Sequence, residues 1–137
     1  MDPNGIRVLR LHALRTFLCF VLVSAMCGLN CACIVPECVD STEEVASSPD
    51  GKFIATEFIH NCGATTPYVT AVVLHPVGQT VNISNPENWV FSARGKVPIH
   101  LEWIGGKVIR VSGKLREEDV REKRREWQSV AIEYKFD

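Results

Sequence analysis

Residues 16–35 form an uninterrupted run without a single charged side chain, and Arg7, Arg10 and Arg15 stand just before it. All but one of the acidic residues come after this run. Twenty helical residues rise about 30 Å, which matches the hydrocarbon core of a bilayer, and preceding arginines hold that end in the cytoplasm. We therefore interpret residues 1–35 as a signal peptide or membrane anchor, and we expect the rest of the chain to be exported.

The fate of this apolar leader stays open between cleavage and retention as an uncleaved helix. Ala25, Gly28 and Ala32 supply the small residues of a cleavage region, but they do not form a clear A-x-A pattern. Lipid attachment is a third, weaker interpretation, for which Cys33 after Ala32 is the best placed cysteine. A buried helix of a globular core is disfavoured, because such helices rarely run this long without a charge.

Length and charge limit the exported part. The chain has 137 residues, and removing the leader leaves about a hundred, enough for one small domain. Beyond residue 35 there are 12 Lys and Arg against 15 Asp and Glu. Because binding to phosphate backbones needs a basic face, this mildly acidic balance argues against nucleic acid as a partner.

Two of the six cysteines, Cys38 and Cys62, lie in the exported part. Thiols outside the cytoplasm usually pair, so we predict a Cys38–Cys62 disulfide, with two unpaired thiols as the alternative. It would close a loop of about two dozen residues and add roughly 3 kcal/mol in the chain-entropy model. A metal cluster of Cys27, Cys31, Cys33 and Cys38 is less favoured, since the spacing lacks the paired C-x2-C pattern of zinc sites.

The sequence after residue 35 indicates an all-β domain. Residues 36–48 are polar and acidic without a clear period, which favours a linker, and Ser48-Pro49-Asp50-Gly51 has the composition of a tight turn. The predicted β domain spans residues 49–137. Alternating or continuous apolar patterns predict strands at 52–60, 68–75, 89–92, 97–104, 107–112 and 128–136, with a hairpin turn at Gly105-Gly106. We expect a small antiparallel sandwich or half-open barrel of about six strands, preceded by the N-terminal hydrophobic helix.

Residues 116–126 are a charged segment in which Val120 is the one uncharged residue of eleven. Glu117–Arg121 and Asp119–Lys123 are favourable i,i+4 pairs, and we expect a short exposed helix or a mobile loop. Such a segment is usually a solvated face, and an electrostatic docking element is the sharper alternative.

After the apolar leader come a cysteine, an SPDG turn and a Cys-Gly-Ala-Thr-Thr segment, at Cys38, residues 48–55 and residues 60–66. This order of motifs resembles that of a group of small, uncharacterised bacterial exported proteins. Residues 89–91 and 101–103 resemble the later strands. The likeness covers about residues 38–112 and implies a topology and a compartment, but no chemistry.

Candidate catalytic or metal-binding residues are few. Cys62 and His60 lie two positions apart and would share a face of a strand, as a nucleophile and base of a small hydrolase would. The orienting group that such a pair needs is not legible in the sequence, so disulfide pairing is the simpler account of Cys62. His60, His75 and His100 are a further possible metal set, although no ligand spacing supports it.

We therefore expect a non-enzymatic exported domain, anchored in the membrane by residues 16–35 or released from it, that binds or supports another component of the cell envelope. The domain would lie in the periplasm or the extracellular space. The alternative is a cysteine-dependent hydrolase that uses Cys62 and His60. We predict no cofactor, and the sequence indicates neither the envelope partner nor the oligomeric state.

Overall fold

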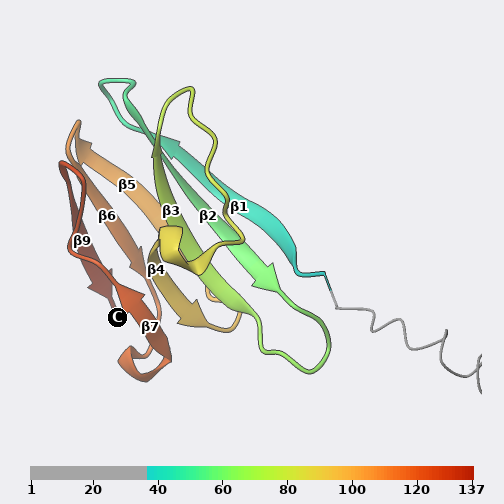
Figure 1. Ribbon diagram of the computed structural model, residues 1–137. Helices are drawn as coiled ribbons and strands as arrows, with labels where there is room; N and C mark the ends of the chain where they lie inside the picture. The colour runs from blue at the N-terminus through green and yellow to red at the C-terminus, as the bar shows by residue number, and fades with distance from the viewer. Residues whose placement is uncertain (1–36) are drawn as a thin grey trace, which may run out of the picture. The chain divides into compact units, whose positions relative to one another are not determined.

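The computed structural model describes residues 37–137, which hold nine strands in two sheets packed face to face (Figure 1). The first sheet has the order β1-β2-β3-β4-β7 and the second has the order β5-β6-β9-β8. The first five strands along the chain are β1 (Val39–Ser47), β2 (Phe53–Asn61), β3 (Val69–Pro76), β4 (Trp89–Arg94) and β5 (Ile99–Gly105). The last four are β6 (Val108–Gly113), β7 (Val120–Lys123), β8 (Glu126–Trp127) and β9 (Val130–Phe136). The predicted all-β class is confirmed. Of the two predicted architectures, residues 37–137 have two packed sheets and not a half-open barrel, with nine strands instead of about six.

The predicted N-terminal helix and residues 1–35, taken as signal peptide or anchor, lie outside the described residues. Within residues 37–137 no helix has the length and apolar character needed to cross a bilayer. The two helical turns in this part are single 3-10 turns, η1 at Pro86–Asn88 and η2 at Glu117–Asp119.

The first sheet starts as an antiparallel meander through β1, β2 and β3. The predicted turn at Ser48–Gly51 joins β1 to β2, and Gly51 adopts a φ of 68°, a left-handed conformation that glycine reaches without steric cost. The hydroxyl of Ser48 accepts hydrogen bonds from the backbone N–H groups of Lys52 and Phe53 and donates to Asp50. This network fixes the turn and so sets the register of the two strands.

Residues 36–48 are not a linker, because most of them form strand β1. This strand lies at the edge of the first sheet and exposes most of its side chains. A bulge between Thr42 and Glu44 also interrupts its alternation. An exposed, bulged edge strand has no regular apolar pattern, which is why its sequence indicated a connection rather than a strand.

The second sheet is mixed rather than wholly antiparallel. β5 and β6 form the predicted hairpin, although its tight turn falls at Gly106–Lys107, one residue later than expected. β9 then pairs parallel with β6. A parallel return needs a crossover connection, and residues 114–129 provide it.

The charged segment at residues 116–126 is not the short helix or mobile loop that the sequence predicts, because it contains strand β7 and the start of β8. After the turn η2, strand β7 pairs with β4 at the edge of the first sheet, and β8 then pairs with β9 in the second. The segment thus passes from one sheet to the other. Its strands are short and exposed, so backbone pairing with neighbouring strands overrides the helical charge spacing.

Two apolar clusters hold the domain together. The main core lies between the sheets and joins the inner faces of β2, β3 and β4 to those of β5, β6 and β9. A smaller cluster lies on the outer face of the first sheet, where Val81 and Ile83 of the β3–β4 connection pack against Phe58, Ala71, Val73 and Trp89. The connection therefore covers part of the outer face, next to the end of β2.

Candidate functional site

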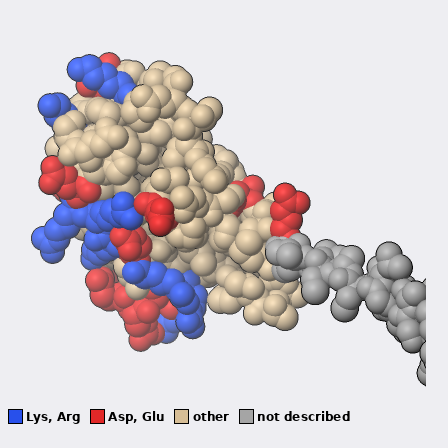
Figure 2. Space-filling view, in the orientation of Figure 1, with Lys and Arg blue, Asp and Glu red and all other residues tan. Residues whose placement is uncertain are grey.

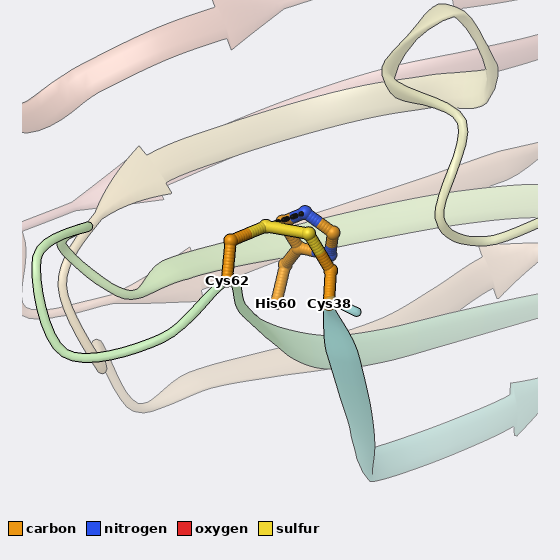
Figure 3. A group of neighbouring side chains, drawn as sticks. All are labelled: Cys38, His60 and Cys62. Atoms are coloured by element: carbon orange, nitrogen blue, oxygen red, sulfur yellow. Dashed lines mark hydrogen bonds between the residues drawn. A yellow bond between two sulfur atoms is a disulfide. The ribbon is translucent and has the colours of Figure 1, made fainter. Parts of the chain in front are cut away.

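The predicted cysteine pair is brought together at the start of β1 and the end of β2 (Figure 3). Val39 pairs with Asn61 in the ladder, so one residue further out Cys38 lies across from Cys62. Their sulfur atoms lie at bonding distance and form the disulfide that the sequence predicts. The link ties the first residues of the edge strand to its neighbour.

His60 lies directly beside this sulfur pair and contacts a partner with each ring nitrogen. Its Nε2 is 3.0 Å from Sγ of Cys62, and its Nδ1 is 2.6 Å from Oδ1 of Asp40. The side chains of His60 and Asp40 are only 13% and 9% exposed. The three residues thus form a chain from carboxylate to imidazole to sulfur that is largely shielded from water.

Residues of the β3–β4 connection and of β4 hold Asp40 and His60 in place. The Ser84 hydroxyl, from the β3–β4 connection, donates a hydrogen bond to Oδ2 of Asp40. The ring of Trp89 meets the ring of His60 edge-on at 5.4 Å between centroids, and the Trp89 indole N–H donates to the Ile83 carbonyl at 2.7 Å. The imidazole is therefore positioned by polar contacts on one side and by aromatic packing on the other.

Cys38, His60 and Cys62 each offer a donor atom, and these atoms lie within 4.8 Å of one another. With the two sulfurs joined, neither is a thiolate, so the group does not bind a metal ion in the disulfide form. The predicted histidine set does not come together around it. His100 contacts Glu44 at 3.1 Å, and His75 contacts the Pro76 carbonyl. Of the predicted cysteine cluster, only Cys38 belongs to the described residues.

A second candidate site is a cleft of about 530 Å³ on the other side of the first sheet. The bulge in β1 turns Glu44 toward the second sheet, since one extra residue reverses the faces of all that follow. Glu44 then lies opposite Glu57 of β2 in the ladder. The lining comprises Glu43, Glu44, Glu57, Ile59, Lys96, Val97, Pro98 and Ile99.

Glu57 is the unusual group of this cleft, because it is a carboxyl that is 4% exposed. Burial raises its pKa to about 7, and the negative charge of Glu44 opposite adds to the rise. The backbone N–H of Ile99 and the nearby His100 oppose it but do not cancel it. Glu44 itself accepts a hydrogen bond from the backbone N–H of Leu101, which joins the two sheets at this end.

The charged segment forms the most strongly charged region seen in Figure 2, where blue and red side chains intermingle. Its charges pair mainly with one another, as in Arg116 with Asp119 at 2.9 Å and Lys123 with Glu117 at 3.2 Å. Exposed pairs of this kind contribute little and leave no large field of one sign. The segment is therefore better described as a solvated face than as a docking element.

Asp40 is the residue that the sequence analysis missed. Once Cys38 is paired with Cys62 across two antiparallel strands, the residue two after the first must face the residue two before the second. Asp40 is accordingly the ladder partner of His60. The positions of the two cysteines therefore predict that Asp40 faces His60. The assignment of residues 36–48 to a linker left Asp40 outside any predicted strand, so this pairing was not considered.

No protein-family model, curated protein or solved structure matches the chain.

Proposed function

We propose that this protein is an exported, membrane-anchored β-sandwich domain that binds or supports another component of the cell envelope and is not an enzyme. The leader at residues 16–35 would carry the membrane attachment, and residues 37–137 would face the periplasm or the extracellular space. The strand ladder places Cys38 across from Cys62, and a pair of this kind persists as a disulfide in an oxidising compartment, which supports export. We also propose that the chain is related to the group of small bacterial exported proteins that it resembles.

The observation that carries a binding role is the cleft between β2 and β5. Its volume of about 530 Å³ lies within the range of small-ligand sites. Its wall combines apolar side chains, such as Ile59 and Ile99, with three carboxyl groups and one amine, those of Glu43, Glu44, Glu57 and Lys96. A surface of this composition suits a hydrogen-bond-donating or cationic group on a partly apolar partner, such as a lysine side chain of an envelope protein.

A crosslinking pull-down with the full chain as bait tests this role. The bait is compared with a variant in which Glu44→Gln and Glu57→Gln remove the carboxylates of the cleft. Glu126→Gln, at an exposed position of β8, is the matched control. Capture of a partner by wild type and control, with loss in the cleft variant, supports the proposal. Equal capture by all three would place binding elsewhere and refute the role of the cleft.

The membrane location has its own test. The intact mass of the protein isolated from membranes distinguishes a retained leader, a cleaved chain and a lipid-modified cysteine. Recovery of the protein in the cytosol, with Cys38 and Cys62 both open to alkylation under non-reducing conditions, would overturn the proposed export.

A cysteine-dependent hydrolase remains the second candidate because the contacts of His60 supply the orienting group that the sequence did not reveal. Cys62, His60 and Asp40 stand in the order of nucleophile, base and orienter. Cys62 can act only when it is not bonded to Cys38. The test is turnover of activated esters by reduced protein, with Cys62→Ser as control; no turnover above that control excludes the hydrolase.

A further inference from the structure

The contacts of His60 define the hydrogen bonds of the site in the disulfide form. A disulfide sulfur carries no proton, so it can only accept a hydrogen bond. Nε2 faces the sulfur of Cys62 and Nδ1 faces Asp40, at 3.0 Å and 2.6 Å. The contact at 3.0 Å is therefore a hydrogen bond in which the N–H of Nε2 donates to the sulfur. Asp40 holds the ring in this orientation through Nδ1.

The contact also makes the two sulfurs unequal. The nitrogen of His60 lies at hydrogen-bond distance from Cys62, while Cys38 is the other end of the bond, at the start of the edge strand β1. In thiol–disulfide exchange the sulfur that leaves must accept an electron pair, and a leaving thiolate that is better stabilised leaves faster. A hydrogen-bond donor beside Cys62 stabilises that thiolate, so the geometry favours attack on Cys38.

We propose that the Cys38–Cys62 disulfide is a directional thiol-exchange site whose co-reactant is a dithiol, either a small molecule or a protein with two neighbouring cysteines. A thiolate of the dithiol attacks Sγ of Cys38 and forms a mixed disulfide there. The Cys38–Cys62 bond breaks, its electron pair passes to Sγ of Cys62, and Nε2 of His60 donates its proton to that sulfur.

The second thiolate of the dithiol completes the reaction. It attacks the donor's own sulfur in the mixed disulfide, the bond to Cys38 breaks, and the Cys38 thiolate takes a proton from water. The domain ends as two thiols and the dithiol ends as a disulfide, so two electrons have passed from donor to domain. His60 has given up one proton and recovers it from solvent.

The surroundings are consistent with this use. Cys38 and Cys62 are half-buried, so the sulfur pair is reachable, whereas the ring of His60 is shielded. The charged group that faces His60 from β1 is Asp40. The β3–β4 connection contributes the hydroxyl of Ser84, and β4 contributes the uncharged ring of Trp89. Asp40 is a positioning residue, because it acts on the sulfur only through His60.

The site of attack is measured on the full chain in mild detergent. Free thiols of the unreduced protein are first blocked with N-ethylmaleimide. Glutathione is then added, the reaction is quenched with iodoacetamide, and tandem mass spectrometry locates each adduct. We expect glutathione on Cys38 and the alkyl group on Cys62. Glutathione on Cys62, or an even division between the two, would overturn the proposal, and this result depends on no variant.

The rate of reduction by dithiothreitol gives the second readout. The disulfide of His60→Asn is expected to be reduced at least tenfold more slowly at pH 7, since general acids contribute about 100- to 10000-fold. Asp40→Asn should show a smaller loss, and His75→Asn, whose ring contacts its own strand, should match wild type. The advantage of wild type over His60→Asn should shrink at high pH, where the leaving thiolate no longer needs a proton. Equal rates at all pH values would refute the role of His60.

Discussion

Glu57→Gln should make the domain more stable at alkaline pH and leave it almost unchanged at acid pH. Glu57 lies 4% exposed in the cleft, opposite Glu44, and its pKa in the folded protein is about 7, against an ordinary value of 4.5. The native state therefore retains a proton between these two pH values that the unfolded chain has released. Since the native state binds more protons in this window, stability falls as pH rises through it.

The magnitude follows from the same two values. Each whole step between folded and unfolded pKa corresponds to about 1.4 kcal/mol, so the rise to about 7 sets an upper limit of about 3 kcal/mol. The cleft is open to solvent, which screens the charge of Glu44, and we expect about half of that limit. Glutamine has nearly the same shape as a protonated carboxyl but cannot ionise, so it removes the penalty above pH 7.

Urea denaturation of the full chain from pH 4 to pH 8.5 checks this prediction. The free energy of unfolding of the variant should exceed that of wild type by about 1–2 kcal/mol at pH 8, and the difference should disappear near pH 4.5. Glu126→Gln, at an exposed strand position, should show no such trend. A difference that stays constant with pH, or grows toward acid pH, would show that Glu57 ionises normally in the cleft.

The remaining predictions concern stability. Replacing both Cys38 and Cys62 by serine should lower the free energy of unfolding by about 3 kcal/mol, because the 24-residue separation gives the unfolded chain much more freedom; a loss below 1 kcal/mol in non-reducing urea titrations would mean that the link does not constrain the unfolded state. Gly51→Ala should cost about 1 kcal/mol, since an alanine at a φ of 68° meets its own carbonyl, and the melting temperature should fall by several degrees. An unchanged melting temperature would show that the turn accepts another conformation. Tyr134→Phe should cost about 1–2 kcal/mol, because the lost hydroxyl lies 2.6 Å from the Arg124 carbonyl and 3.1 Å from that of Val90. Chemical denaturation measures this, and a neutral result would mean that water replaces the hydroxyl.

The fold was predictable where the signal for an element lies within a short stretch of sequence. The alternation of Val130, Ile132 and their exposed neighbours marked β9 correctly, and the composition of residues 48–51 marked the first turn. These features depend on side-chain period and turn chemistry, which a few consecutive residues contain. The edge strand β1 was missed because an exposed, bulged strand has no period to detect.

The sequence by itself determined the all-β class, most strand positions and the pairing of Cys38 with Cys62, because these follow from local pattern and from the presence of two cysteines after residue 35. Only the tertiary structure decided which side chains meet. The register of β1 against β2 places Asp40 on His60, the bulge turns Glu44 toward Glu57, and the crossover makes β9 run parallel to β6. These contacts depend on hydrogen bonding between strands distant along the chain, and a shift of one residue in that pairing would move each side chain to the opposite face.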